Sequence, residues 1–556
     1  MGSIMSSLKS SERIRLKSIS CLWLILCVPA LFAASAPTPV DKPFEFYPRS
    51  NGDKPVTYTK TPVSWQQDGK NWDFKYGAKV VVTIDAGQVI RNVTPYQFGN
   101  NLCWYDGREW LSDSDRSDKA QQAGISFWRF PGGSSSDLYN WDGIYDQAAP
   151  DQTNPGHMNE SWASSTDNYI QFCENTNSEG IITVNYGASR YASVKYAADL
   201  ASRWVGYFKQ KGFKIRYWEI GNELYGPWEE SNTLAGKPQL TGDEYGADFQ
   251  VIAQAMRQAD PDIFIGAVTY EKDGPGEWDG HHNWTRKLFS TLGGKADFLI
   301  LHQYFLYPFK NGDSNQYADP SNETLFGNLH ELGDDLASMR KMAAETAPGQ
   351  ENLPVALTEF NILNASPTQT IQLINGLFTA EALGEAIKVG YAAANYWDWK
   401  NGIDTKLNGD MGMLALRDNN TKDDTPRPSY YAYALYNKAF GDKMVASSSS
   451  DPAFKVYASR FSSGEMGLIL VNESTDNRWA TFSIKGFQPK GKLMGWVLTA
   501  KGLNDTQVSW NGVPGTVGGG GPFPLDSIKP YRGEFKTDRV LQLPLAAHSA
   551  TGIILY

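Results

Sequence analysis

Two glutamates stand where short apolar runs end, and they are the residues of this chain best suited to chemistry. Glu223 follows Asn222 directly after the run at 213–221, and Glu359 stands inside VALTEF at 355–360. Runs of this length and composition predict buried β-strands. A carboxylate at the C-terminal end of a buried strand suits a parallel β/α barrel, whose active sites lie on that rim. An Asn-Glu pair alone is typical of a solvated turn, so the second glutamate carries the argument.

Polar or aromatic residues also end other predicted strands, where a buried strand should simply stop. They are Arg129, His302, Tyr304, Trp397 and Trp399. Two carboxyls suit hydrolysis of a glycosidic bond, because one protonates the leaving oxygen while the other attacks the anomeric carbon. The two carboxyls need different pKa values and therefore different surroundings. An arginine beside the nucleophile keeps it ionised, and tryptophan faces can stack on sugar rings.

The elements that must position these residues alternate between apolar runs and amphipathic stretches from 95 to 440. The runs predicted as strands are 98–101, 125–130, 180–187, 213–220, 262–270, 296–304, 355–360 and 390–399. The stretches predicted as helices include 166–177, 195–211, 241–259, 284–292, 329–346, 369–387 and 429–440. Alternation of strand and helix predicts a parallel sheet, and eight repeats predict an α/β fold of the closed (β/α)8 TIM-barrel type.

The segments that flank the barrel have a different character. Residues 441–556 contain short strand-like runs separated by Gly, Ser, Asn and Pro, which predicts a C-terminal antiparallel β-sandwich. The lead-in at 37–94 includes a β-rich stretch at 72–93, which we expect to add strands to the sandwich. The glycine run at 518–521 precedes no helix, so we interpret it as a loop rather than a phosphate site.

The N-terminus is typical of an export signal. Four basic residues precede an apolar run at 21–32 and small residues at 33–36, so we expect residues 1–36 to be a signal peptide. The apolar run is too short to span a bilayer, and Cys27 does not follow a small residue as a lipoprotein anchor requires. We therefore expect a secreted or periplasmic protein without a membrane anchor.

Composition narrows the possible partners. The 556 residues are 41% hydrophobic and 20% charged, as in a globular protein. The formal net charge is −10 with no basic block, so nucleic acid is not an expected partner. Aromatic residues make up 13%, which slightly favours a carbohydrate partner. No dinucleotide or P-loop fingerprint is present, and we expect no cofactor. The sequence does not indicate an oligomeric state.

Two groups of residues could suggest metal sites, and for both a structural role is the better interpretation. Asp113, Asp115 and Asp118 have the spacing of a helix N-cap as well as that of a cation site. His281-His282 lacks partner ligands at the spacing of a zinc site. We therefore expect no metal.

Three other polar or reactive residues also have structural interpretations. Only Cys103 and Cys173 remain after signal removal, and two buried thiols are a better interpretation than one disulfide. Glu219 alternates with its neighbours inside the predicted strand, so we expect it to take part in structural pairing rather than catalysis.

Four motifs, taken together, resemble a known group. They are RFPGG at 129–133, GNELYGPW at 221–228, EYG at 244–246 and LHQY at 301–304. The pattern is similar to the clan of retaining glycoside hydrolases with a (β/α)8 barrel and catalytic glutamates on strands four and seven. Within that clan it most resembles family 51 α-L-arabinofuranosidases. The resemblance covers about residues 95 to 440.

The resemblance implies roles for the strand-end residues. Glu223 would be the acid/base and Glu359 the nucleophile. Asn222 would contact the sugar hydroxyl next to the anomeric carbon, Tyr304 would bond the nucleophile, and Arg129 would support it. The remaining substrate-binding candidates are His302, Trp397 and Trp399. The implied function is cleavage of plant or algal polysaccharide.

Two departures from the family 51 pattern leave the sugar open. That family usually has Asp-Glu-Trp around the nucleophile, whereas this chain has Thr358-Glu359-Phe360, and its eighth strand NYWDW is unusually aromatic. Both departures are compatible with an endo-acting β-glycanase of the same clan, acting on glucan, xylan or galactan. A non-catalytic carbohydrate-binding protein on a barrel scaffold is an alternative of another class. Retention of both glutamates counts against it.

Overall fold

The computed structural model describes residues 42–48, 54–142, 162–233, 236–272, 283–306, 320–416, 421–515 and 519–556. The expected signal peptide at 1–36 and His281-His282 lie outside these ranges. Across the described ranges, no helix has the length and apolarity needed to cross a membrane.

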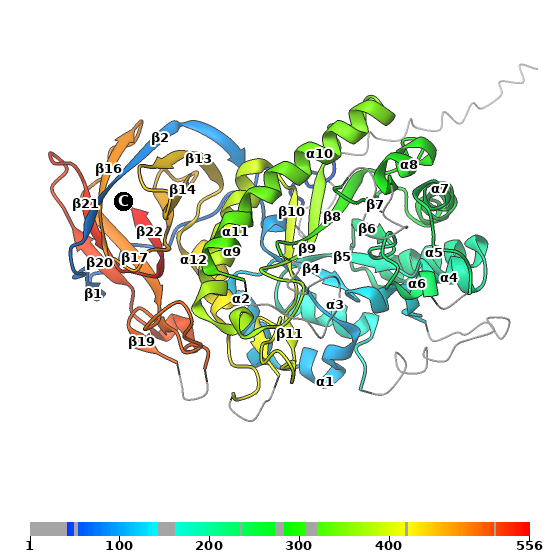
Figure 1. Ribbon diagram of the computed structural model, residues 1–556, viewed down its shortest axis with the longest axis horizontal. Coiled ribbons are helices and arrows are strands. Elements are labelled where there is room, and N and C mark those ends of the chain that lie inside the picture. Colours follow the sequence, from blue (N-terminus) through cyan, green and yellow to red (C-terminus); the bar gives the residue numbers. More distant parts are fainter. Residues whose placement is uncertain are drawn as a thin grey trace, which may run out of the picture. The chain divides into compact units, whose positions relative to one another are not determined.

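Eight parallel strands close into a barrel within the described residues, which confirms the predicted fold class (Figure 1). In chain order they are β3 (Gly99–Asn101), β4 (Phe127–Phe130), β5 (Glu179–Val184), β6 (Tyr217–Ile220), β7 (Phe264–Val268), β8 (Phe298–Tyr304), β9 (Val355–Asn361) and β10 (Ala393–Tyr396). Nearly every strand residue is buried, as expected when side chains fill the barrel on one face and helices cover the other.

Helices follow the barrel strands and surround them (Figure 1). They are α1 (Arg108–Leu111), α2 (Ser114–Ala123), α3 (Thr166–Asn175), α4 (Gly187–Tyr191), α5 (Val194–Lys211), α6 (Glu230–Thr233), α7 (Gly242–Ala259), α8 (Trp284–Thr291), α9 (Asn322–Gly327), α10 (Glu331–Thr346), α11 (Leu373–Val389) and α12 (Pro428–Ala439). Asp113 caps α2 by accepting a hydrogen bond from the backbone of Asp115, and Thr241 with Glu244 forms a capping box on α7. The Asp113 cap confirms the sequence interpretation of this group.

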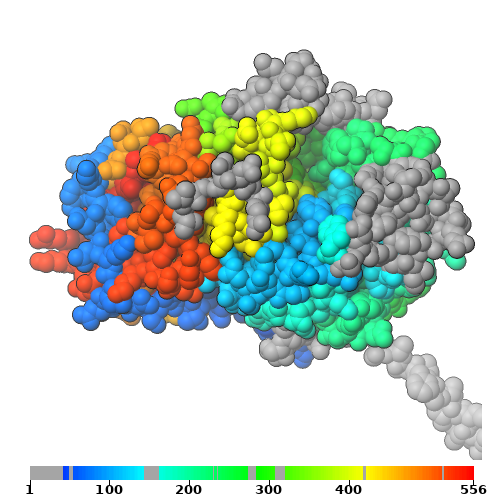
Figure 2. Space-filling view, turned by 90° about the horizontal axis from the view of Figure 1, so that it is seen from below, coloured from blue at the N-terminus to red at the C-terminus, as the bar shows by residue number. Residues whose placement is uncertain are grey.

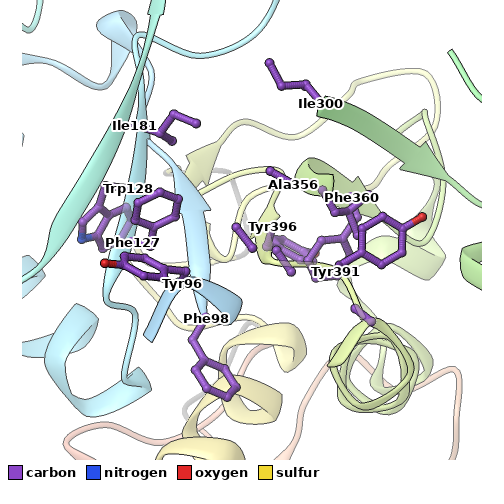
Figure 3. Close-up of a cluster of buried hydrophobic side chains, with 14 of the residues drawn as sticks. Tyr96, Phe98, Phe127, Trp128, Ile181, Ile300, Ala356, Phe360, Tyr391 and Tyr396 are labelled. Carbon is purple, nitrogen blue, oxygen red and sulfur yellow. The ribbon is translucent and has the colours of Figure 1, made fainter. Parts of the chain in front are cut away.

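Aromatic side chains pack at the N-terminal end of the barrel. Tyr96 and Phe127 lie side by side there, as Figure 3 shows, with ring centroids 5.1 Å apart. Phe44, from the segment that precedes the barrel, stacks on Tyr217 at 4.6 Å and meets Phe298 edge-on at 5.1 Å. The backbone N–H of Phe44 also donates to the Tyr217 hydroxyl at 2.9 Å. The N-terminal lead-in therefore contributes to the core at this end of the barrel.

The second sheet combines both ends of the described chain. Its order is β1 (Lys70–Asn71), β20 (Tyr531–Glu534), β17 (Lys492–Thr499), β22 (Ser549–Leu555), β15 (Met466–Asn472), β14 (Phe454–Arg460), β13 (Lys443–Ser449), β2 (Ala78–Asn92), β16 (Arg478–Lys485) and β21 (Gln542–Leu545). The short strands β18 (Ser509–Trp510) and β19 (Val513–Pro514) extend from β17. Blue N-terminal and orange-red C-terminal atoms accordingly lie together in Figure 2.

The pairing in this sheet is antiparallel except between β1 and β20 and between β2 and β16. The long strand β2 of the lead-in pairs with β13 on one side and with β16 on the other. Side chains from β2, β14, β15, β16, β21 and β22 share one apolar core. The curled sheet therefore packs on itself in the manner of a sandwich.

Helices α11 and α12 pack against the strands of this second sheet. At Gly384 on α11 a Cβ atom would lie 2.5 Å from the ring of Tyr457 on β14, so a glycine is needed for the close approach. A second apolar cluster joins residues of the barrel, α12 and the sheet. Cys103 and Cys173 are both buried thiols that form no disulfide, which confirms the expectation for them.

Candidate active site

The two predicted glutamates lie at the ends of the fourth and seventh barrel strands. Glu223 follows β6 in a turn that begins at Gly221, and Glu359 lies near the end of β9. A carboxylate oxygen of each glutamate and a ring nitrogen of His302 all lie within 4.8 Å of one another. The carboxyls of retaining glycosidases are about 5–5.5 Å apart, whereas those of inverting enzymes are about 6.5–9.5 Å apart. Oxygens no more than 4.8 Å apart are compatible with the shorter, retaining separation of the carboxyls.

The carboxylate of Glu359 is buried and held at both oxygens. Its Oε1 accepts a hydrogen bond of 2.7 Å from Nη1 of Arg129, and its Oε2 accepts one of 2.6 Å from the hydroxyl of Tyr304. Only 5% of the side chain is exposed. Donors at both oxygens hold this carboxyl group in one orientation.

The carboxylate of Glu223 has a different and more open environment. Its side chain is 16% exposed, against 5% for Glu359. Oε1 lies 2.9 Å from Nδ1 of His302, and Oε2 accepts a hydrogen bond of 3.0 Å from the indole of Trp228. Burial acts to raise the pKa of Glu223, but the hydrogen bonds and positive charge of His302 outweigh it and hold the pKa below its usual value.

His302 links the two glutamates. Its Nδ1 is 2.9 Å from Glu223 and 3.6 Å from Glu359, and its Nε2 is 3.1 Å from the hydroxyl of Thr358. Burial lowers the pKa of His302, but the charge of Glu359 and the hydrogen bond to Glu223 outweigh burial and raise it. The charges of Glu223 and His302 therefore depend on each other.

A bulge in β9 sets this arrangement. Leu301 of β8 pairs with Leu357, but the next residue, His302, pairs with Glu359, so Thr358 is an extra residue in β9. The pairing of β10 with β9 shifts over the same residues. Bulges next to active sites redirect side chains, and this one places Glu359 opposite His302.

Among the residues that the structure describes, Glu223, His302 and Glu359 have ligand atoms close enough together to hold a metal ion. Each of the four carboxylate oxygens already has a protein partner, from His302, Trp228, Arg129 and Tyr304. The positive charge of Arg129 beside Glu359 also opposes a cation. The donor set therefore fits a hydrogen-bonded pair of carboxyls better than a metal centre.

Arg129 on β4 is completely buried at the centre of the site. Its guanidinium donates to Glu219, Asn101, Glu359 and Asn222 over distances of 2.7 to 3.1 Å. Glu219 also accepts a hydrogen bond from Thr183. Glu219 therefore has the structural pairing role that the sequence predicted for it, while Arg129 connects that pair to both Glu359 and Asn222.

The two candidate tryptophans of the eighth strand differ in position. Trp397 is partly exposed and lies against Gly132 and Gly133, whose backbone with positive φ brings it near the indole. Trp399 is fully buried and packs edge-on against Trp128 at 5.3 Å. The prediction that Trp399 binds substrate is therefore wrong. β10 ends at Tyr396, so the alternation of a strand no longer relates residue 399 to residue 397.

Trp228 and Glu229 contact the predicted pair Asn222-Glu223 but were not themselves predicted as site residues. Trp228 holds Oε2 of Glu223 and remains 44% exposed. Glu229 accepts a hydrogen bond from the amide of Asn222. Both belong to the turn that follows β6, and the GPWE sequence at 226–229 was the available signal, although no spacing rule assigns its side chains to Asn222 and Glu223.

Comparisons with known proteins find similarity to α-L-arabinofuranosidases. Residues 119–297 match a family model described as alpha-L-arabinofuranosidase 1 domain. Over these residues the chain is similar to α-L-arabinofuranosidases. It resembles the retaining glycoside hydrolases of clan A, most of all family 51. The matched domain contains Arg129, Asn222 and Glu223 and ends before Tyr304 and Glu359.

Individual relatives are distant. Alpha-L-arabinofuranosidase C of Emericella nidulans is 25% identical over 56% of this chain and 61% of its own length. An alpha-L-arabinofuranosidase from Thermotoga maritima, solved as an arabinose complex, superposes with a TM-score of 0.63 at 18% identity, over 86% of this chain and 100% of that one. A family 44 xyloglucanase from Paenibacillus polymyxa gives 0.60 at 14% identity, over 86% and 99%. These structures share the fold of this chain.

Proposed function

We propose that this chain is a retaining glycoside hydrolase that cleaves plant or algal polysaccharide by double displacement. The observation that carries the proposal is the pair of glutamates at the ends of β6 and β9, with carboxylate oxygens within 4.8 Å of each other. Their unlike partners also separate the roles. Glu359 is fixed by Arg129 and Tyr304, as a nucleophile requires, whereas Glu223 is more exposed and exchanges protons with His302.

In the first step, an oxygen of Glu359 attacks the anomeric carbon and the glycosidic C–O bond breaks. The proton for the departing oxygen comes from the coupled Glu223–His302 pair, through Glu223. The products of this step are a sugar ester of Glu359 and the released alcohol. Arg129 and Tyr304 hold Glu359 in line, so little reorganisation is needed when the bond forms.

In the second step, Glu223 takes a proton from water while the water oxygen attacks the anomeric carbon and the ester bond to Glu359 breaks. Esterified Glu359 carries no negative charge, so it no longer raises the pKa of His302. The pair gave its proton to the leaving alcohol in the first step, so Glu223 is a carboxylate when a base is needed. Glu223, hydrogen-bonded to His302, therefore delivers a proton in the first step and accepts one in the second.

For the substrate we propose an α-L-arabinofuranoside first and a β-linked glucan, xylan or galactan as the alternative. The matched domain and the Emericella nidulans relative, named alpha-L-arabinofuranosidase C, support the first. The alternative, with endo action, is supported by Thr358 and Phe360 beside the nucleophile, and by the comparable superposition of the family 44 xyloglucanase. We also propose that the protein is secreted or periplasmic, on the basis of the signal-like residues 1–36.

A panel of aryl glycosides and polysaccharides with product analysis tests this function. We expect turnover of aryl α-L-arabinofuranoside and release of arabinose. Release of oligosaccharides from a β-glycan instead would favour the endo-glycanase. Binding without turnover of any glycoside would identify a non-catalytic carbohydrate-binding protein and would refute the proposal.

Variants of the two glutamates test their roles. Glu359→Ala should lose activity on every substrate by several orders of magnitude, because no ester can form, and azide should restore turnover with an inverted product. Glu223→Ala should still react with an activated aryl glycoside, which needs little protonation, and should then stall without a base. Azide should rescue it with retained configuration. Near-normal rates in Glu359→Ala would show that the nucleophile is another residue.

A further inference from the structure

Glu229 is a third carboxyl beside the two glutamates, and the mechanism above does not use it. It follows Trp228 in the turn after β6, and its side chain is completely buried. Its Oε1 accepts hydrogen bonds from the hydroxyl of Ser134 at 2.8 Å and from the amide of Asn222 at 3.2 Å. Burying a carboxyl completely costs free energy, so we expect its hydrogen bonds to have a structural or functional role.

The contacts of Asn222 supply that reason. Its Oδ1 accepts a hydrogen bond of 2.8 Å from Nη2 of Arg129, and its Nδ2 donates to Oε1 of Glu229. An arginine can only donate, and an oxygen that already receives the hydroxyl of Ser134 acts as an acceptor. The two partners therefore permit one orientation of the amide and oppose its flip. Nδ2 keeps a second N–H, which remains a donor.

Two consecutive residues of the turn after β6 form hydrogen bonds with the Asn222-Glu223 pair. Trp228 donates to Glu223, and Glu229 accepts from Asn222, the residue just before Glu223. Asn232 donates to the carbonyls of Leu224 and Gly226 and so holds the turn in this shape. These hydrogen bonds within the turn therefore fix the position of Glu229 relative to Asn222.

We propose that Glu229 is a positioning residue that, together with Arg129, fixes the Asn222 amide so that its nitrogen serves as a hydrogen-bond donor to the sugar. This inference rests on the proposed function, in which Asn222 contacts the hydroxyl next to the anomeric carbon. A hydrogen bond to that hydroxyl strengthens in the transition state of glycoside hydrolysis. Glu229 therefore acts on the rate through Asn222 without touching the sugar.

The charge state of Glu229 agrees with this role. Burial raises the pKa of Glu229 well above its usual value, and the nearby carboxylates of Glu223 and Asp137 raise it further, against a smaller opposite effect of Ser134. The charge of Glu359 also raises the pKa of Glu229. A neutral carboxyl has one carbonyl-type oxygen and one hydroxyl. Two donors converge on Oε1, so the proton belongs on Oε2.

Substitutions at Glu229 separate positioning from charge. Glu229→Gln keeps an acceptor oxygen for Asn222, so kcat should stay within about threefold of wild type, since one neutral hydrogen bond replaces another. Glu229→Leu removes the acceptor and lets the amide rotate. Its kcat should fall about 10- to 100-fold, the worth of one or two hydrogen bonds, with KM changed less than about threefold. Glu229→Met serves as a second variant if Glu229→Leu does not fold. Equal losses in Glu229→Gln and Glu229→Leu would overturn the proposal.

A double-mutant cycle with Asn222→Ala provides the specific control. If Glu229 acts through Asn222, then Glu229→Leu should lower kcat no further once Asn222 is already alanine. Losses that multiply would show that Glu229 acts by another route and would contradict the proposal.

The same cycle measured by thermal unfolding does not depend on activity. The two residues share a buried hydrogen bond, so their effects on the unfolding midpoint should be less than additive. If no glycoside is hydrolysed, the proposed function fails while this cycle still decides whether Glu229 holds Asn222. Additive midpoints would overturn the contact on which the inference is built.

Discussion

Replacement of Arg129 tests whether one buried guanidinium serves both the fold and the reaction. In Arg129→Met the four hydrogen bonds to Glu219, Asn101, Glu359 and Asn222 are lost. Glu219 is then a completely buried carboxylate without its cation, and breaking a buried ion pair in this way costs about 3–5 kcal/mol of stability. Glu359 loses a charged hydrogen bond of 2.7 Å, worth about 1.5–3 kcal/mol, which corresponds to about a 10- to 150-fold loss in rate.

The two effects separate in a second variant. Adding Glu219→Gln to Arg129→Met removes the stranded charge, so denaturant unfolding should recover part of the lost stability. Activity should not recover, because Glu359 and Asn222 still lack their partner. Arg129→Lys should be intermediate in both assays, since a lysine cannot reach four acceptors in a planar fork. Recovery of activity together with stability in the double variant would refute the division of roles.

Two further predictions concern stability away from the glutamate pair. Phe44→Ala should lower the free energy of unfolding by about 3–5 kcal/mol, because a ring packed on Tyr217 is removed, and should leave KM unchanged; a change in KM at unaltered stability would contradict it. Burial, with the carboxylates of Glu271 and Glu331, raises the pKa of Asp335 to about 8, so wild-type stability should fall as pH rises from about 4 through about 8. Asp335→Asn cannot titrate, so between pH 5 and pH 9 its melting temperature should fall less than that of wild type. A stability difference between the two proteins that is the same at both pH values would contradict the raised pKa of Asp335.

The barrel and most of the site could be predicted because strand ends carry their own signal. Buried parallel strands are apolar along their length, so Arg129, His302 and Glu359 stand out as polar residues inside such runs. The closed barrel then brings the ends of β4, β6, β8 and β9 to one rim. A β-branched or apolar residue at those positions would have removed the signal.

The contacts that set the chemistry needed the structure. The bulge at Thr358 changes the pairing of His302 by one residue, and no pattern in VALTEF marks an extra residue. The link between Glu229 and Asn222 depends on how the turn folds back, because neither strand nor helix period relates residues 222 and 229. Trp399 was misplaced for a similar reason, since the strand ends before it.

The most direct test of the mechanism is the mass of the enzyme–sugar adduct in the Glu223→Ala variant. With an activated aryl glycoside this variant should form the ester and hydrolyse it slowly, because the base for water is missing. After rapid quenching and proteolysis, the mass of one glycosyl unit should be found on the peptide that contains Glu359. An adduct on a different carboxylate, or release of inverted product by wild type without any adduct, would contradict the retaining mechanism and the role of Glu359.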